Sequence, residues 1–194
     1  ETGRGTLIGI IDGWNGTRND PRMGVTILQS VYGTPGDGSD TPPEVTLQDG
    51  VPLLPDDTEA PPPAWDGDDW WWIRDDGYLG GDMTRPKVHD TNAYMANGTL
   101  VVNLPPADIL FFAGDAGARV RLTDGKIVGE LSDDGQTLHD VTVAGRWPLS
   151  ELIATAPNVG VCNGTGEFDV LTNMLEDIAD VLASPGTGGA DARC

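Results

Sequence analysis

The chain has 194 residues, of which 38% are hydrophobic, and its formal net charge at pH 7 is −20. This length suits one well-cored domain or two small ones, and apolar segments that recur along the chain exclude wholesale disorder. The negative charge repels nucleic acids and anionic membrane surfaces, so we expect neither as a partner. No segment reaches the about 20 apolar residues that a membrane-spanning helix needs, so we expect no transmembrane segment.

The first 82 residues combine two strands with a long irregular segment. Residues 5–12 and 24–32 are rich in β-branched residues and are bounded by turn formers, which predicts a buried strand at each place. Residues 33–82 carry many prolines, thirteen acidic residues and one basic residue. We interpret this stretch as an acidic, Pro/Trp-rich excursion from a single β-rich domain comprising residues 1–194.

From about residue 98 the pattern is regular. Apolar or alternating runs predict strands over 99–104, 107–113, 118–122, 126–131 and 137–147. Turns of the Asp-Gly type at 123–126 and 132–136 indicate an antiparallel meander. Pro148 begins a short helix that ends near residue 155, and apolar spacings of three and four predict a longer helix over 167–183.

The two cysteines, Cys162 and Cys194, are separated by 31 residues near the end of the chain. A thiol metal site would need closer spacing or more histidine partners than His89 and His139 provide. We therefore predict a disulfide that closes a helical tail over residues 148–194, with two free thiols as the alternative. A disulfide indicates an oxidising compartment, and hence an extracytoplasmic location.

These features together predict a fold class. We expect a mostly β protein, an antiparallel β-sandwich or open barrel, with one C-terminal helix packed on the sheet and a disulfide-closed tail.

Residues 65–78 place four tryptophans and five aspartates in fourteen positions. Three consecutive tryptophans on a strand must point to alternating sides, so at least one should face away from the core. We predict a ligand-binding surface for a protein or a glycan, with the alternative that the indoles only anchor the long loop to the sheet. The predicted ligand-binding residues are Trp65, Trp70, Trp71, Trp72 and Tyr78.

Calcium is the candidate cofactor of this segment, because hard cations prefer carboxylate oxygens on Gly-containing loops. The spacing does not match a helix–loop–helix calcium site, since Trp70 occupies the position where that loop needs glycine. The alternative is that the acids only keep an aromatic loop soluble. The predicted metal ligands are Asp66, Asp68, Asp69, Asp75 and Asp76.

Motifs for catalysis are absent from the sequence. There is no Gly-x-Ser-x-Gly nucleophile elbow and no phosphate loop or dinucleotide fingerprint. We interpret His89 and His139 as polar residues of loops or strands rather than catalytic bases. A hydrolase that uses two carboxylates is a further alternative, because such pairs are placed by the fold rather than by spacing. Asn15, Asn97 and Asn163 each begin Asn-Gly-Thr, which we interpret as turn chemistry, with N-glycosylation as the alternative.

Residues 95–194 combine a strand meander, the Gly145-Arg146-Trp147-Pro148 helix start, and a helix between the two cysteines. In these features this part of the chain resembles a family of uncharacterised secreted lipoproteins of myxobacteria. The resemblance implies an exported or lipid-anchored envelope protein and no known activity. The family usually continues past the last cysteine, so the resemblance also implies that the chain extends beyond Cys194.

Taken together, the sequence predicts an extracytoplasmic bacterial surface module, secreted or attached to the outer membrane as a lipoprotein. It would bind a protein or glycan partner through the Trp/Asp-rich region, with calcium as a candidate aid. The first alternative is a structural envelope lipoprotein domain without a small ligand, and the second is the carboxylate-dependent hydrolase.

Overall fold

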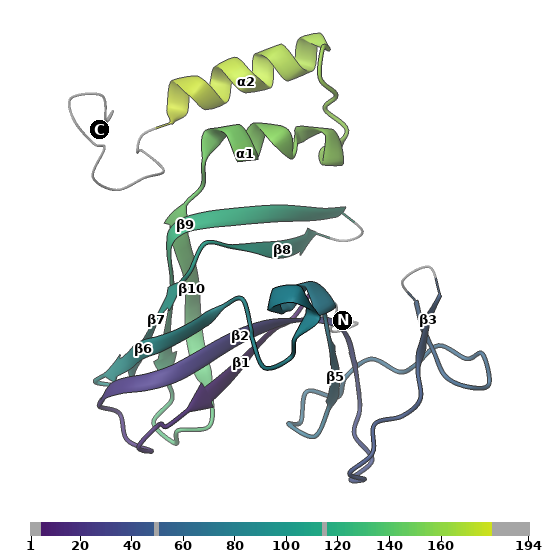
Figure 1. Ribbon diagram of the computed structural model, residues 1–194, viewed down its shortest axis with the longest axis vertical. Helices are drawn as coiled ribbons and strands as arrows, with labels where there is room; N and C mark the ends of the chain where they lie inside the picture. The colour runs from purple at the N-terminus through teal and green to yellow at the C-terminus, as the bar shows by residue number, and fades with distance from the viewer. Residues whose placement is uncertain (1–4, 49–50, 114–115, 180–194) are drawn as a thin grey trace. The chain divides into compact units, whose positions relative to one another are not determined.

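The computed structural model describes residues 5–48, 51–113 and 116–179 (Figure 1). The protein is mostly β, its strands pair antiparallel, and helices follow the last strand. The backbone contacts divide the chain into two compact units. Unit 1 comprises Glu1–Ile8 and Ile27–Pro86, and unit 2 comprises Gly9–Thr26 and Lys87–Cys194. The predicted excursion at 33–82 lies within unit 1.

Strands β1 (Leu7–Asp12) and β2 (Asp20–Thr34) each contribute residues to both units. Both strands were predicted, although β2 is longer than expected at 15 residues. The prediction that β1 is buried was wrong, because its last four residues are exposed. β2 alternates buried and less buried positions over most of its length, and this pattern makes it a central element of each unit.

Unit 1 contains the second part of β2, from Ile27 to Thr34. Strand β5 (Trp70–Ile73) pairs antiparallel with β2, and β3 (Thr46–Gln48) forms a small hairpin with β4 (Val51–Leu53). Two single-turn 3₁₀ helices follow β5, η1 (Asp75–Gly77) and η2 (Leu79–Gly81). The buried apolar side chains of this unit include Leu28, Tyr32 and Ala60.

Unit 2 contains an antiparallel sheet with the strand order β1-β2-β6-β7-β9-β10, and β8 pairs with β9. The strands after β2 are β6 (His89–Ala96), β7 (Thr99–Leu104), β8 (Ala107–Ala113), β9 (Ala116–Leu131) and β10 (Leu138–Arg146). β7, β8 and β10 match their predicted ranges closely, whereas β6 was not predicted. Among the residues whose burial is described, the buried apolar side chains of this unit are Met23, Val25, Ala93, Met95, Leu100, Val102, Leu104, Val120, Ile127 and Ala156.

The hairpin predicted at 123–126 is wrong, because β9 runs continuously through these residues. Its first part pairs with β8 and its second part pairs with β7 and β10. Asp124 takes a left-handed conformation with φ of 53°, and the register with β10 shifts at this point. The Asp-Gly pair therefore makes an irregularity within a long strand instead of a chain reversal. The second predicted turn, at 132–136, is confirmed and joins β9 to β10.

Both predicted C-terminal helices are present, but the longer one does not pack on the sheet as expected. The short predicted helix is α1 (Leu149–Ala154), a 3₁₀ turn η3 (Ala156–Val159) follows, and the longer helix is α2 (Gly166–Ile178). α1 and η3 contact β9, whereas α2 packs along α1 (Figure 1). As a result α2 leaves part of its apolar surface exposed, including Ile178, which is 64% exposed.

The predicted disulfide joins one cysteine that the structure describes to one that lies outside the described residues. Cys162 is exposed and forms no disulfide with any residue that the structure describes, while Cys194 lies outside the described residues. The bond therefore remains a prediction. The last part of the predicted helix, from residue 180 to 183, lies outside them as well. Within the described ranges, none of the helices has the length and apolar character to cross a membrane.

Candidate functional site

The three consecutive tryptophans lie on β5, where the pairing with β2 decides which way each side chain points. Trp72 pairs with Tyr32, and their rings stack with centroids 4.5 Å apart at an interplanar angle of 15°. Tyr32 is only 2% exposed, so this stack belongs to the core of unit 1. Side chains alternate along a strand, and Trp71 must therefore lie on the opposite face of β5.

Trp71 fits on that face because its partner on β2 is a glycine. It pairs with Gly33, and a Cβ atom built on Gly33 would come within 2.5 Å of the Trp71 ring. The absence of a side chain on Gly33 leaves the space that the Trp71 indole occupies. The ring of Trp65 lies beside it, with centroids 5.2 Å apart and planes tilted by 56°. Trp65 is 52% exposed, so the pair presents indole surface to solvent.

Trp65 is held in an unusual backbone conformation. Its φ is 61°, in the left-handed region that bulky residues rarely adopt. The Asp69 carboxylate accepts hydrogen bonds from the backbone N–H groups of Ala64 (2.7 Å) and Trp65 (2.8 Å). This carboxylate closes the turn and fixes the strained residue. Strain that the surrounding structure maintains at an exposed aromatic residue is typical of a functional position.

The acidic residues of unit 1 stabilise turns in several places. Thr58 Oγ1 donates a 2.6 Å hydrogen bond to Asp56, and Thr84 Oγ1 donates a 2.7 Å bond to Asp82. These hydroxyl hydrogen bonds, with a backbone N–H bond in each case, lower the pKa of both carboxyls. Arg74 makes a bidentate pair with Asp76, with both N–O distances 2.9 Å. That ion pair raises the pKa of Arg74.

The five predicted calcium ligands have different local roles. Asp69 and Asp76 make the contacts given above, and Asp66 accepts a 3.1 Å hydrogen bond from the backbone N–H of Asp68. Asp68 and Asp75 are exposed, and no hydrogen bond of their carboxylates is described. Among the described residues, none of these five belongs to a group of three side chains that could share one ion. The calcium site therefore stays a prediction.

Of the five predicted ligand-binding residues, the structure brings Trp65 and Trp71 into contact. Trp72 is committed to the Tyr32 stack, and Trp70 is half-buried at the beginning of β5. Tyr78 caps η1 and pairs with Pro86 across an isolated β-bridge. The solvent-facing part of the predicted surface thus consists of Trp65 and Trp71, which we call the indole pair. Asp66 and Asp68 follow Trp65 in the chain.

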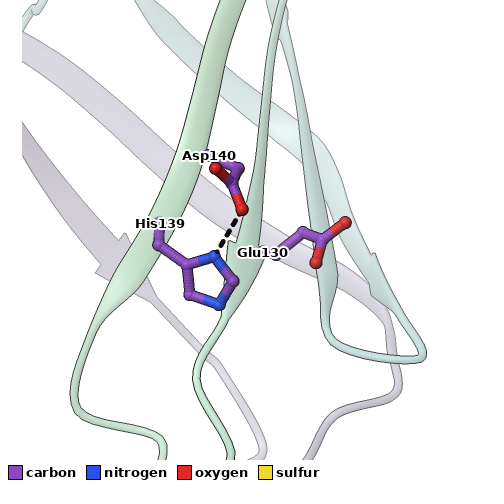
Figure 2. A group of neighbouring side chains, drawn as sticks. All are labelled: Glu130, His139 and Asp140. Atoms are coloured by element: carbon purple, nitrogen blue, oxygen red, sulfur yellow. Dashed lines mark hydrogen bonds and ion pairs between the residues drawn. The ribbon is translucent and has the colours of Figure 1, made fainter.

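Unit 2 contains a second group of candidate site residues, which the sequence did not reveal. Glu130 on β9 pairs in register with His139 on β10, and Asp140 follows at a register shift with φ of 51° (Figure 2). Asp140 Oδ2 lies 2.8 Å from His139 Nδ1. One potential ligand atom from each of the three residues lies within 4.8 Å of the others, and all three residues are exposed. Only the strand register, which single-sequence patterns do not show, places Glu130 beside this histidine.

The other histidine has a structural contact. His89 Nδ1 lies 2.8 Å from Thr26 Oγ1, across the pairing of β2 with β6 in unit 2.

No protein-family model matches the chain, and neither a curated protein nor a solved structure matches it. The functional assignment must therefore rest on the chemistry of the two groups of side chains.

Proposed function

We propose that the protein is a binding module that recognises a neutral glycan through the indole pair. The observation that carries this proposal is Trp65, a strained and half-exposed tryptophan held in place by Asp69 beside a second indole. Exposing a large apolar ring costs free energy unless a ligand covers it, so a fixed, exposed indole favours a recognition role.

The surroundings of the indole pair suit a sugar better than an anionic partner. The apolar C–H face of a pyranose ring can stack on a flat indole. The carboxylates of Asp66 and Asp68, in the turn that follows Trp65, can accept hydrogen bonds from sugar hydroxyls. Thirteen acids against one base in residues 33–82 would repel a sulfated or uronic-acid glycan. This charge is why the proposal specifies a neutral ligand.

The location of the protein is part of the same proposal. An extracytoplasmic module, secreted or lipid-anchored as the resemblance to the myxobacterial lipoproteins implies, would meet glycans at a cell surface. A disulfide between Cys162 and Cys194, in a sandwich or open-barrel body, would suit that oxidising environment. Calcium would act there as an aid to ligand binding, through the acids near the indole pair.

The test measures binding of the purified protein to soluble neutral polysaccharides by affinity electrophoresis, with a dextran, a β-glucan and a mannan in separate gels. Trp65→Gly removes the indole while keeping a residue that tolerates positive φ, so we expect a folded protein that has lost retardation. Leu79→Ala is the matched control, because Leu79 is a 43% exposed apolar residue of the same unit. This control should bind like the wild type.

Two results would contradict the proposal. The first is a wild-type protein that none of the three polysaccharides retards. The second is a Trp65→Gly variant that is retarded as strongly as the wild type. Trp65→Phe should keep part of the affinity, because a smaller flat ring remains at the same position.

A further inference from the structure

We propose that Glu130, His139 and Asp140 form a surface site for a divalent transition-metal ion, for which zinc is the test ion. The site lies wholly in unit 2 and is independent of the glycan proposal, which concerns unit 1. It supplies one imidazole nitrogen and two carboxylates, which are established zinc ligands. Figure 2 shows the His139 imidazole and the Asp140 carboxylate facing each other on β10, with Glu130 of β9 beside them and its carboxylate turned away from the imidazole.

The backbone explains why these three side chains meet. Glu130 and His139 are directly opposite each other in an antiparallel pair, so their side chains share one face. Asp140 would ordinarily point to the other face, because neighbouring residues alternate along a strand. Its left-handed conformation, at the register shift between His139 and Thr142, redirects the carboxylate toward the imidazole. Bulges commonly redirect side chains in this way.

The spacing of the donor atoms suits a single ion. Metal bonds of about 2.0–2.1 Å place neighbouring ligand atoms about 3 Å apart. His139 Nδ1 and Asp140 Oδ2 lie 2.8 Å apart, and an ion can replace the hydrogen that joins them. The three ligand atoms already lie within 4.8 Å of one another, and the long exposed side chain of Glu130 can close the remaining gap.

The donor set selects the class of ion. Imidazole nitrogen is a good ligand for zinc, nickel and copper, whereas calcium and magnesium prefer oxygen ligands throughout. The two carboxylates supply two negative charges, which balance a divalent cation. All three residues are exposed, so water can complete the coordination and the ion can enter directly from solvent.

The first experiment is isothermal titration calorimetry of the untagged full chain with ZnCl₂, in buffer that contains excess MgCl₂ to occupy nonspecific acidic sites. We expect one saturable site in the wild type. His139→Ala should weaken zinc binding by at least about tenfold. His89→Ala removes the only other histidine and should leave the affinity unchanged. Replacing both cysteines, Cys162→Ser with Cys194→Ser, removes sulfur as a competing ligand and should also leave the affinity unchanged.

The second experiment locates the ion without relying on affinity. Paramagnetic Co²⁺ should broaden or shift the imidazole NMR signals of His139 and leave those of His89 sharp. Glu130→Gln and Asp140→Asn should each reduce this effect, with circular dichroism confirming that the variants remain folded. The proposal is overturned if zinc does not bind, if His139→Ala binds it unchanged, or if cobalt perturbs both histidines equally.

Discussion

The Asp69 carboxylate accepts a 2.8 Å hydrogen bond from the backbone N–H of Trp65. The same carboxylate binds the N–H of Ala64, so one side chain satisfies two neighbouring donors in the turn that leads into β5. Trp65 needs this support because its φ of 61° is unfavourable for a bulky residue. The position of the exposed indole thus depends on a carboxylate that the sequence suggested as a metal ligand.

Asp69→Ala should destabilise unit 1 and weaken glycan binding together. The two N–H groups lose their acceptor, which we expect to cost about 1–2 kcal/mol in the free energy of unfolding. Urea denaturation followed by tryptophan fluorescence measures this loss, and affinity electrophoresis measures binding. Asp75→Ala is the control, since Asp75 is an exposed acid for which no side-chain contact is described. Equal stability of the two variants would show that Asp69 does not hold the turn.

Gly33→Ala should displace Trp71 and loosen β5. The added Cβ would lie 2.5 Å from the Trp71 ring, which is too close for real atoms, so the indole or the strand must move. We expect a loss of about 1–3 kcal/mol in the free energy of unfolding, as for other overpacked positions. Gly77→Ala is the matched control in the same unit, because its Cβ would only touch Leu28 at an ordinary 3.8 Å. The measurement is thermal unfolding of the two variants, whose stability is compared with that of the wild type.

The strands of the second half could be predicted because their sequences alternate or form short apolar runs. β7 and β8 begin and end where the pattern indicated. The Asp124-Gly125 pair was misleading, since the same local chemistry serves a hairpin turn and an irregularity within a strand. Which of the two forms depends on pairing with β7 and β10, and this pairing is a long-range property.

The two candidate sites also differ in how far the sequence alone could predict them. Trp65 and Trp71 are close in the sequence, so their density alone indicated a surface of interest. Glu130 and His139 are separated by a turn and meet through strand register, while Asp140 joins them through its left-handed backbone. β6 was missed for a related reason. It begins with polar residues, and one of them, Asp90, is buried by tertiary contacts.

Asp90 should make the protein sensitive to acid. Its side chain is 8% exposed, and it accepts hydrogen bonds from the Asn103 backbone N–H (2.7 Å), the Asn103 side chain (3.0 Å) and the Asn92 backbone N–H (2.8 Å). Burial alone would raise the pKa of this carboxyl. The hydrogen bonds together outweigh burial and lower it. A lowered folded-state pKa contributes stability above the unfolded-state value of about 3.9, which is lost as the pH falls through the folded-state value.

Asp90→Asn tests this contribution. We expect the variant to lose about 1–3 kcal/mol at pH 7, because an amide replaces an ionised acceptor. Its free energy of unfolding should also fall less than that of the wild type as the pH drops below about 4. The measurement is urea denaturation at a series of pH values. Parallel pH profiles for the two proteins would contradict the role assigned to the Asp90 carboxylate.

Tyr32 should limit the stability of the protein at high pH. Burial raises the pKa of its hydroxyl from 10.0 to about 12, because the ionised form would lose its hydration in the core beside Trp72. The unfolded chain then releases this proton at a lower pH than the folded protein. The stability contribution is complete below about pH 10 and is lost as the pH rises toward about 12.

Tyr32→Phe keeps the aromatic ring that stacks on Trp72 and removes the ionisable group. We expect its free energy of unfolding to decline less steeply than that of the wild type between pH 10 and 12, as measured by urea denaturation. Spectrophotometric titration provides an independent check, because the folded wild type should show one more tyrosine that ionises late than the variant does. If Tyr32 ionises near pH 10 in the folded protein, the stack with Trp72 does not exclude water from the hydroxyl, which would contradict the effect assigned to burial.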